Sequence, residues 1–321
     1  MTAKHFLRRA LLGAAPLLLA LASTGASAQA FPSKPIRWVV PYAAGGPADV
    51  IARIVHARLQ EALGQPVVID NRPGGNANIG HELVSKAAPD GYTILYVVPN
   101  IVTNTLLYRN MVDPIRELSP VARITTQAYI LVGNPNFPAR TVPEMIEQAR
   151  KRGVNCASGG GLPGFGCMWF KSFSKADFTH VLYKGNGPAM NDLIGGQVNV
   201  MIDLFNTALP QVNAGRARAI ATTASKRGPP LPNLPAIAET IPGFALEGWH
   251  GIMAPPGTPA PILERLSQAF RTALSDPGVA RRISESGIEV TPSSPAEFGE
   301  TLRDDLAKYT KITQDAGIKP E

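Results

Sequence analysis

The sequence predicts an α/β protein of two lobes, each built on a mostly parallel sheet flanked by helices. Three observations favour this fold class. Strand-like and helix-like patterns alternate along the chain, which is typical of parallel sheets covered by helices. A strand, a glycine-rich turn and a helix occur at residues 38–59 and again at 154–173. The expected mature chain, residues 29–321, is long enough for two lobes with separate cores.

The first strand–turn–helix unit is the most informative part of the chain. A short apolar run at 38–40 is typical of a buried strand and ends at Pro41. The turn at 42–46 is Tyr-Ala-Ala-Gly-Gly. Apolar residues then recur at helical spacing: Val50, Ile51, Ile54, Val55 and Leu59. Such a turn directs unpaired N–H groups and the positive end of the helix dipole at one point, which suits an anion.

The residues of the turn limit the class of anion that it can bind. It lacks the lysine of a phosphate loop and the G-x-G-x-x-G spacing, so nucleotides are poor candidates. A small carboxylate fits better. The alternative is that the turn only packs the helix against the sheet.

The other elements repeat this alternation. In the first half we expect strands at 66–70 and 92–97, a turn at 71–75 and a helix at 79–87. In the second half we expect strands at 129–132 and 154–157, a helix at 142–152, a glycine turn at 158–164 and an amphipathic run containing Met168, Trp169, Phe170 and Phe173. Helical patterns at 261–274, 279–286 and 295–316 are expected to cover the first lobe. The two glycine turns could then face each other across a cleft, where small molecules usually bind.

The N-terminus predicts export. Lys4, Arg8 and Arg9 precede an apolar run at 10–22, and residues 23–28 end in the small-x-small pattern of a signal-peptidase site. We therefore expect residues 1–28 to be a cleaved signal peptide and the mature chain to lie in the periplasm. An uncleaved anchor is the alternative.

Charge and composition exclude several partners and cofactors. The signal carries three of the 31 Lys and Arg residues and none of the 24 Asp and Glu residues, which leaves the mature chain with a mild excess of +4. No basic run interleaves with aromatic residues, so we expect no nucleic-acid partner. The five histidines, at positions 5, 56, 81, 180 and 250, lack ligand-type spacing, so we expect no metal and no cofactor, and His180 is interpreted as a packed loop residue.

The two cysteines, Cys156 and Cys167, bracket the second glycine turn. In an oxidising periplasm we expect them to form a disulfide. The bridge would hold the turn in one shape and so lower the ordering cost of binding. The alternative is a pair of small buried apolar side chains.

An ordered set of motifs along the mature chain resembles the solute-receptor family of tripartite tricarboxylate transporters, also called Bug-type receptors. The matching segments are PYAAGGPAD at 41–49, NRPGG at 71–75, PDGYT at 89–93, THVLYKG at 179–185, GPA at 187–189, DLIGGQV at 192–198 and APPGTP at 254–259. The resemblance implies a type II periplasmic-binding-protein fold of the Venus-flytrap kind. Residues 29–127 and 249–321 would form lobe 1 and residues 128–248 lobe 2, with crossings near 126–129 and 249–251.

The resemblance also implies a function. The protein would not be an enzyme. It would be a monomeric receptor that captures a small carboxylate, either a dicarboxylate or an aromatic acid, and delivers it to the permease subunits of a tripartite transporter. The implied contacts are Tyr42, Ala43, Ala44, Gly45, Gly46, Asp49, Asn100, Asn104, Ser158, Gly159, Gly160, Gly161, Tyr183 and Asp203. Alternatives are a ligand-sensing receptor for a two-component kinase and a secreted hydrolase with Ser158 as nucleophile, although Ser158 lacks a G-x-S-x-G elbow.

Several of these residues have a simpler interpretation. Asp49 lies in the first helical turn, where a carboxylate stabilises the helix dipole without a ligand. Asp203 could bind a ligand ammonium, but it would repel a ligand that carries only carboxylates.

The chain has Leu162, Phe165 and Ile101 where the family usually has polar residues, and it has Asn199 and Leu182 in place of a common Asp and Pro. These changes favour an aromatic or longer-chain acid.

Overall fold

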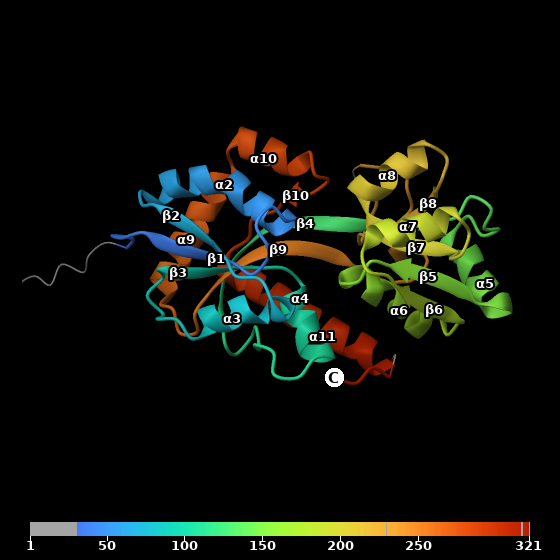
Figure 1. Cartoon of the computed structure of the whole chain (residues 1–321), viewed down its shortest axis with the longest axis horizontal. Coiled ribbons are helices and arrows are strands. Elements are labelled where there is room, and N and C mark those ends of the chain that lie inside the picture. The colour runs from blue at the N-terminus through green and yellow to red at the C-terminus, as the bar shows by residue number, and fades with distance from the viewer. Residues whose placement is uncertain (1–30, 229, 316, 321) are drawn as a thin grey trace, which may run out of the picture.

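The computed structural model describes residues 31–228, 230–315 and 317–320. The expected signal peptide at 1–28 lies outside the described residues. Figure 1 shows two lobes side by side, joined by two strands that run between them. Each lobe has helices on both faces of its sheet.

The first lobe is centred on three parallel strands. Strand β1 (Ile36–Val40) lies between β2 (Val67–Asn71) and β3 (Thr93–Val97) and is parallel to both. The other elements of this lobe are η1 (Gly75–Ala77), α2 (Pro47–Leu63), α3 (Asn78–Ser85), α4 (Asn100–Leu107), α9 (Ala260–Leu274), α10 (Pro277–Ser284), β10 (Glu289–Val290) and α11 (Pro295–Asp315). The ends of β1 and β3 therefore meet at one edge of the sheet, where α2 and α4 begin.

The second lobe repeats the arrangement. Strand β5 (Val154–Ser158) lies between β6 (Phe178–Leu182) and β7 (Val200–Leu204), again parallel to both. The remaining elements are α5 (Val142–Arg152), α6 (Leu162–Ser174), α7 (Asn186–Ile194), α8 (Phe205–Asn213), β8 (Arg218–Thr222) and η2 (Ile237–Glu239). Helices α6, α7 and α8 all begin at the edge where β5, β6 and β7 end.

Two strands connect the lobes. Strand β4 (Ser119–Gly133) pairs with β9 (Glu247–Ala254) up to Ala128, and from Tyr129 onward it pairs with β7 and β8 of the second sheet. Both crossing strands run antiparallel to their neighbours. The parallel strands of each lobe match the sequence expectation, whereas the antiparallel crossing pairs were not anticipated.

The C-terminal helix contacts more than the first lobe. Trp249 Nε1 of β9 donates a hydrogen bond to Asp305 Oδ2 of α11 at 2.7 Å. Farther along α11, the Tyr309 ring lies 5.4 Å from the ring of Phe165, and Ser172 Oγ donates to Asp315 Oδ2 at 2.7 Å. Phe165 and Ser172 belong to α6, so α11 contacts both lobes and not just the first lobe, which it was expected to cover.

The sequence pattern explains the core. All of β1 except Arg37 is buried, and the Trp38 ring packs edge-on against Phe270 of α9. Helix α2 begins at Pro47 and ends at Leu63, and its C-cap is Gly64, whose positive φ of 68° suits a glycine. None of the helices in the described part of the chain is both long and apolar enough to cross a membrane.

Candidate functional site

A cavity of about 440 Å³ lies between the lobes. Lobe 1 lines it with the loops that follow β1 and β2 and with helix α4, which follows β3, and lobe 2 contributes Gly161 and Phe165 at the start of α6. Among the expected contacts, it brings together Tyr42, Ala43, Asn100, Asn104 and Gly161. None of its lining residues carries a formal charge, so an anion bound there would meet neutral donors only.

The first glycine turn is held by a hydrogen bond to the buried side chain of Asp49. Asp49 is 1% exposed. Its Oδ2 accepts hydrogen bonds from Gly45 N at 2.8 Å and Arg53 Nε at 2.7 Å, and its Oδ1 accepts one from Asn71 Nδ2 at 3.1 Å. Burial pushes the pKa of Asp49 up, but these donors together with the Arg53 charge outweigh it and hold the pKa below its usual value. The structure thus turns the Asp49 carboxylate toward its own loop, where it fixes Gly45.

A chain of amides organises the lobe 1 wall of the cavity. Tyr42 Oη donates to Asn100 Oδ1 at 2.8 Å, and burial raises the pKa of Tyr42. Asn104 Nδ2 donates to Asn76 O at 2.8 Å, and Asn100 Nδ2 reaches the same carbonyl at 3.4 Å. Tyr42 therefore stays neutral, and α4 anchors the loop that follows β2.

That loop, at 74–77, was missing from the expected site. Gly74, Gly75, Asn76 and Ala77 have positive φ values of 120°, 54°, 53° and 76°. Such a conformation is costly for Ala77, which has neither the freedom of glycine nor a side chain that can hydrogen-bond locally. Strained backbone of this kind concentrates at functional sites. The signal in the sequence was the Gly-Gly pair two residues after a parallel strand.

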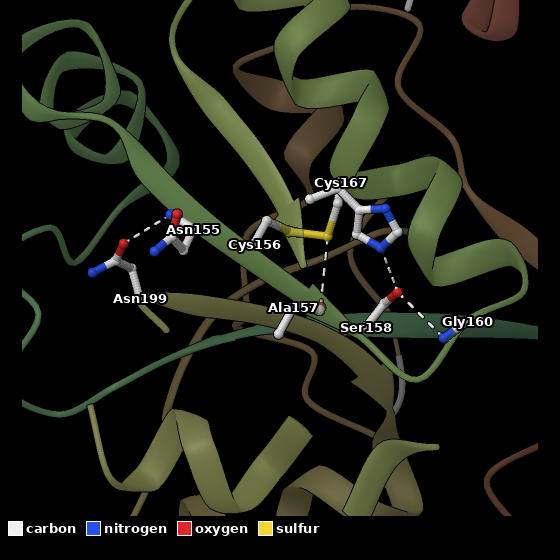
Figure 2. Close-up of a disulfide and its surroundings, with 8 residues drawn as sticks. Asn155, Cys156, Ala157, Ser158, Gly160, Cys167 and Asn199 are labelled. Atoms are coloured by element: carbon white, nitrogen blue, oxygen red, sulfur yellow. Dashed lines mark hydrogen bonds between the residues drawn. A yellow bond between two sulfur atoms is a disulfide. The ribbon is translucent and has the colours of Figure 1, made fainter. Parts of the chain in front are cut away.

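The second glycine turn has a different support. Ser158 is fully buried, and its Oγ lies 2.8 Å from His180 Nε2 and accepts a hydrogen bond from Gly160 N at 3.3 Å (Figure 2). Gly160 and Gly161 have φ values of 97° and 64°, which L side chains rarely adopt. At Gly159, an added Cβ would lie 1.9 Å from Asn186 Oδ1, so the backbones of two loops touch there.

The two cysteines form a disulfide in the structure. Cys156 lies on β5, Cys167 lies on α6, and their sulfur atoms are bonded (Figure 2). The bridge joins the strand before the second glycine turn to the helix after it. The turn is therefore closed covalently at its base.

Two further residues that we expected to contact the ligand, Tyr183 and Asp203, form hydrogen bonds within lobe 2. Tyr183 Oη donates to Asp192 Oδ2 at 2.7 Å, and this hydrogen bond, with burial, raises the pKa of Tyr183. Asp203 is fully buried. Its Oδ1 accepts hydrogen bonds from Asn186 Nδ2 and from Leu204 N, and its Oδ2 has no partner. Burial raises the pKa of Asp203.

A smaller cavity of about 290 Å³ lies on the other side of the first turn. Gly45 and Pro47 line it from lobe 1, and Leu204, Phe205 and Asn206 line it from lobe 2. The first glycine turn therefore has second-lobe neighbours at both cavities. Ala44 and Gly45 are exposed between them, and Gly46 is the N-cap of α2.

The apolar substitutions that favoured a less polar ligand do not all reach the cavity. Phe165 lines it, but Ile101 and Leu162 are buried in the hydrophobic core, and Leu182 is 68% exposed at the end of β6. Phe165 alone therefore favours an apolar ligand body. Its ring packs edge-to-face with the ring of Tyr309 from α11.

The described residues contain no group of three or more His, Cys, Asp or Glu side chains that could hold a metal ion. The Ser158–His180 pair is also a poor hydrolytic nucleophile, because Ser158 is fully buried and its hydroxyl already supports Gly160. The arrangement is best suited to non-covalent binding between the lobes.

Comparison with known proteins agrees with this geometry. Residues 51–318 match the model of the tripartite tricarboxylate transporter family receptor. A UPF0065 protein of Bordetella bronchiseptica is 35% identical, with 95% of this chain and 92% of the relative covered.

Two solved structures are similar over most of the chain. A Rhodopseudomonas palustris protein solved with adipate is 33% identical with a TM-score of 0.73, covering 91% of this chain and 100% of the other. MatC from the same organism, solved with bound malate, is 30% identical with a TM-score of 0.70, covering 88% and 99%. The chain therefore belongs to the tripartite tricarboxylate transporter receptor family, the Bug-type periplasmic solute-binding proteins.

Proposed function

We propose that the protein binds a small dicarboxylate or aromatic acid between its lobes in the periplasm and delivers it to the permease subunits of a tripartite transporter. The observation that carries the proposal is the interlobe cavity of about 440 Å³, lined by neutral polar groups and by Phe165. Backbone amides and Asn side chains can solvate a carboxylate there without a cationic partner. Two similar proteins were solved with adipate and with malate, which supports the acid class.

Binding would close the molecule. An acid that contacts the first glycine turn and the start of α6 together gains interactions that only the closed arrangement offers, so it shifts the population toward closure. The segments that meet it would be the loops at 42–46, 74–77 and 158–161 and the first turn of α4 at 100–104. We keep Ala44, Gly46, Ser158, Gly159, Tyr183 and Asp203 as proposed site residues, with Asp49 and Ser158 acting through the loops they hold.

A charge placed in the cavity tests the proposal. Ala43 is exposed and lines the cavity, so Ala43→Asp adds a negative charge with little cost to folding. We expect adipate, malate or benzoate to stabilise the mature protein in a thermal-shift titration, and we expect Ala43→Asp to weaken that binding by at least about tenfold through like-charge repulsion. The matched control is Ala43→Asn, which has a similar size and no charge. Equal affinity in both variants would place the acid elsewhere.

Delivery and location are tested in cells. A strain that lacks the gene should lose uptake of the labelled acid, and osmotic shock should release a mature chain that begins at Gln29. Retained uptake together with loss of an acid-induced transcriptional response would favour the sensing role instead.

A further inference from the structure

The support of the second glycine turn contains one titratable group, His180. Its ring packs against the first turn of α6, where a Cβ on Gly164 would lie 3.1 Å from His180 Cε1 and 3.3 Å from both His180 Nε2 and Ser158 Oγ. Glycine at 164 therefore leaves the space that lets the ring reach Ser158. His180 is half-buried, and its Nε2 lies 2.8 Å from Ser158 Oγ.

The hydrogen bonds of Ser158 leave two possible positions for the protons. Gly160 N–H donates to Ser158 Oγ, which leaves the hydroxyl proton and the second lone pair of Oγ for His180 Nε2. Either the hydroxyl donates to a neutral ring that carries its proton on Nδ1, or Nε2–H donates to Oγ. The positioning role requires the first arrangement for the neutral ring. Protonation of the ring forces the second: Nε2–H then donates to Oγ, and the hydroxyl proton must turn away. The Gly160 N–H donates to the same oxygen, so the change at the ring alters its hydrogen bond.

The surroundings of the ring are free of charge. Strand β6 packs mainly against β5 and α6. Strand β5 carries no titratable side chain apart from the disulfide-bonded Cys156, and the one charged residue of α6 is Lys171 in its last turn. Asp203 is connected only indirectly, through Asn186, which touches Gly159. Burial alone lowers the pKa of His180.

We propose that His180 is a positioning residue for the second glycine turn and that its protonation is coupled to binding of a carboxylate there. This inference rests on the proposed function. A ligand carboxylate at Gly160 and Gly161 would bring the first negative charge to the neighbourhood of the ring, which favours the imidazolium form. By linkage, the protonated receptor then holds its acid more tightly than the neutral one.

The apo protein tests the positioning role without any ligand. NMR of the full mature chain should show His180 as the Nδ1–H tautomer, and the Gly160 amide resonance should titrate together with the ring. In His180→Gln, whose Oε1 can still accept from Ser158 but takes no proton, the Gly160 amide should stop titrating. A His180 ring protonated on Nε2 at pH 8, or a Gly160 amide that titrates equally in both proteins, would overturn the positioning role.

Affinity as a function of pH tests the coupling. Calorimetric titration with adipate, or with malate or benzoate if they bind more tightly, compares wild type with His180→Gln, so that the acid's own titration cancels. We expect the affinity ratio of wild type to variant to rise as the pH falls from 8 to 5, approaching about tenfold below the pKa of the free protein if the pKa of His180 is one unit higher in the complex. A constant ratio refutes the coupling through His180.

The two proposals fail in different ways. If no acid binds wild type at any pH, the proposed function fails, and the coupling fails with it, while the apo NMR result still decides the positioning role. If the acids bind but the ratio stays flat, only the coupling fails. His180→Ala removes the acceptor as well as the proton, so it should weaken binding at both pH values.

Discussion

The two glycine turns share a local plan and differ in what holds them. Both follow a buried parallel strand and open a helix, α2 in lobe 1 and α6 in lobe 2. The first is fixed by the buried Asp49 carboxylate, which gathers Gly45 N, Arg53 and Asn71. The second is fixed by a disulfide and by the neutral Ser158–His180 pair. The same kind of glycine turn can thus be maintained by ionic or by covalent and neutral means.

The largest effect should come from the covalent support. Replacing both Cys156 and Cys167 with Ala should lower the free energy of unfolding by roughly 3 kcal/mol, because the short loop they close regains its entropy in the unfolded chain. Urea denaturation of the mature protein measures the loss. We expect binding to weaken as well, since the second turn loses its base.

Mass spectrometry checks the premise of that experiment. Thiol alkylation without reductant should leave the mass of the wild-type protein unchanged, whereas two added alkyl groups would show that the bridge does not form. The dithiol form should also keep the first turn intact, because Asp49 acts independently of the cysteines.

The ionic support should respond almost as strongly. Asp49→Asn keeps the shape of the side chain but removes the charge that holds Gly45 N and Arg53, and we expect a loss of about 2–3 kcal/mol. The folded-state pKa of Asp49 is lowered, so its contribution is present above the unfolded value of about 3.9 and is lost as pH falls through the folded pKa.

The stability difference between wild type and Asp49→Asn should therefore be full at pH 7 and should shrink in acid. Denaturant titrations at pH 7 and pH 3 test this sign. A difference that grows in acid would contradict the role given to the Asp49 carboxylate.

The smallest effects should come from the backbone of the turns. Gly45→Ala and Gly161→Ala place a side chain at φ values of 79° and 64°, with no atom within 4 Å of the new Cβ. Strain without a clash should cost about 1–2 kcal/mol each. Measured by thermal unfolding, a much larger loss at Gly161 would mean that the neutral support tolerates strain less well than the ionic one.

Gly160 separates folding from binding. It has a φ of 97°, and an added Cβ would contact only Leu182 Cδ1 at 3.6 Å. A bulky replacement such as Gly160→Leu should leave the protein folded while it abolishes binding of the acid. Unchanged affinity would remove this loop from the site.

Much of the fold follows from local patterns. The strand at 38–40, the helix at 142–152 and the turn at 42–46 are set by apolar periodicity, glycine and proline within a few residues, and the structure has β1, α5 and the turn between β1 and α2 there. The second turn is shorter than the expected 158–164, because α6 begins at Leu162. The expected crossing regions could be named only through a family resemblance. The antiparallel pairing of β4 with β9 joins residues more than a hundred positions apart, which no local pattern encodes.

The sequence likewise predicted only part of the candidate site. Glycine-rich turns at the ends of parallel strands could be recognised from the sequence, and Tyr42, Ala43, Asn100, Asn104 and Gly161 do share one cavity. The sequence could not show that Ser158 and Asp49 are turned into the protein, nor that Ile101 faces the core. The direction of a side chain depends on which distant residues pack beside it.

The sequence by itself thus determined the class of fold, the two turns and the cysteine pair, because these depend on interactions between near neighbours in the chain. Only the tertiary structure decided which residues line the cavity, that the loop at 74–77 belongs to it, and that His180 and Gly160 contact the same hydroxyl of Ser158. Those contacts arise when separate strands and helices pack together, and their free energy is absent until the lobes have formed.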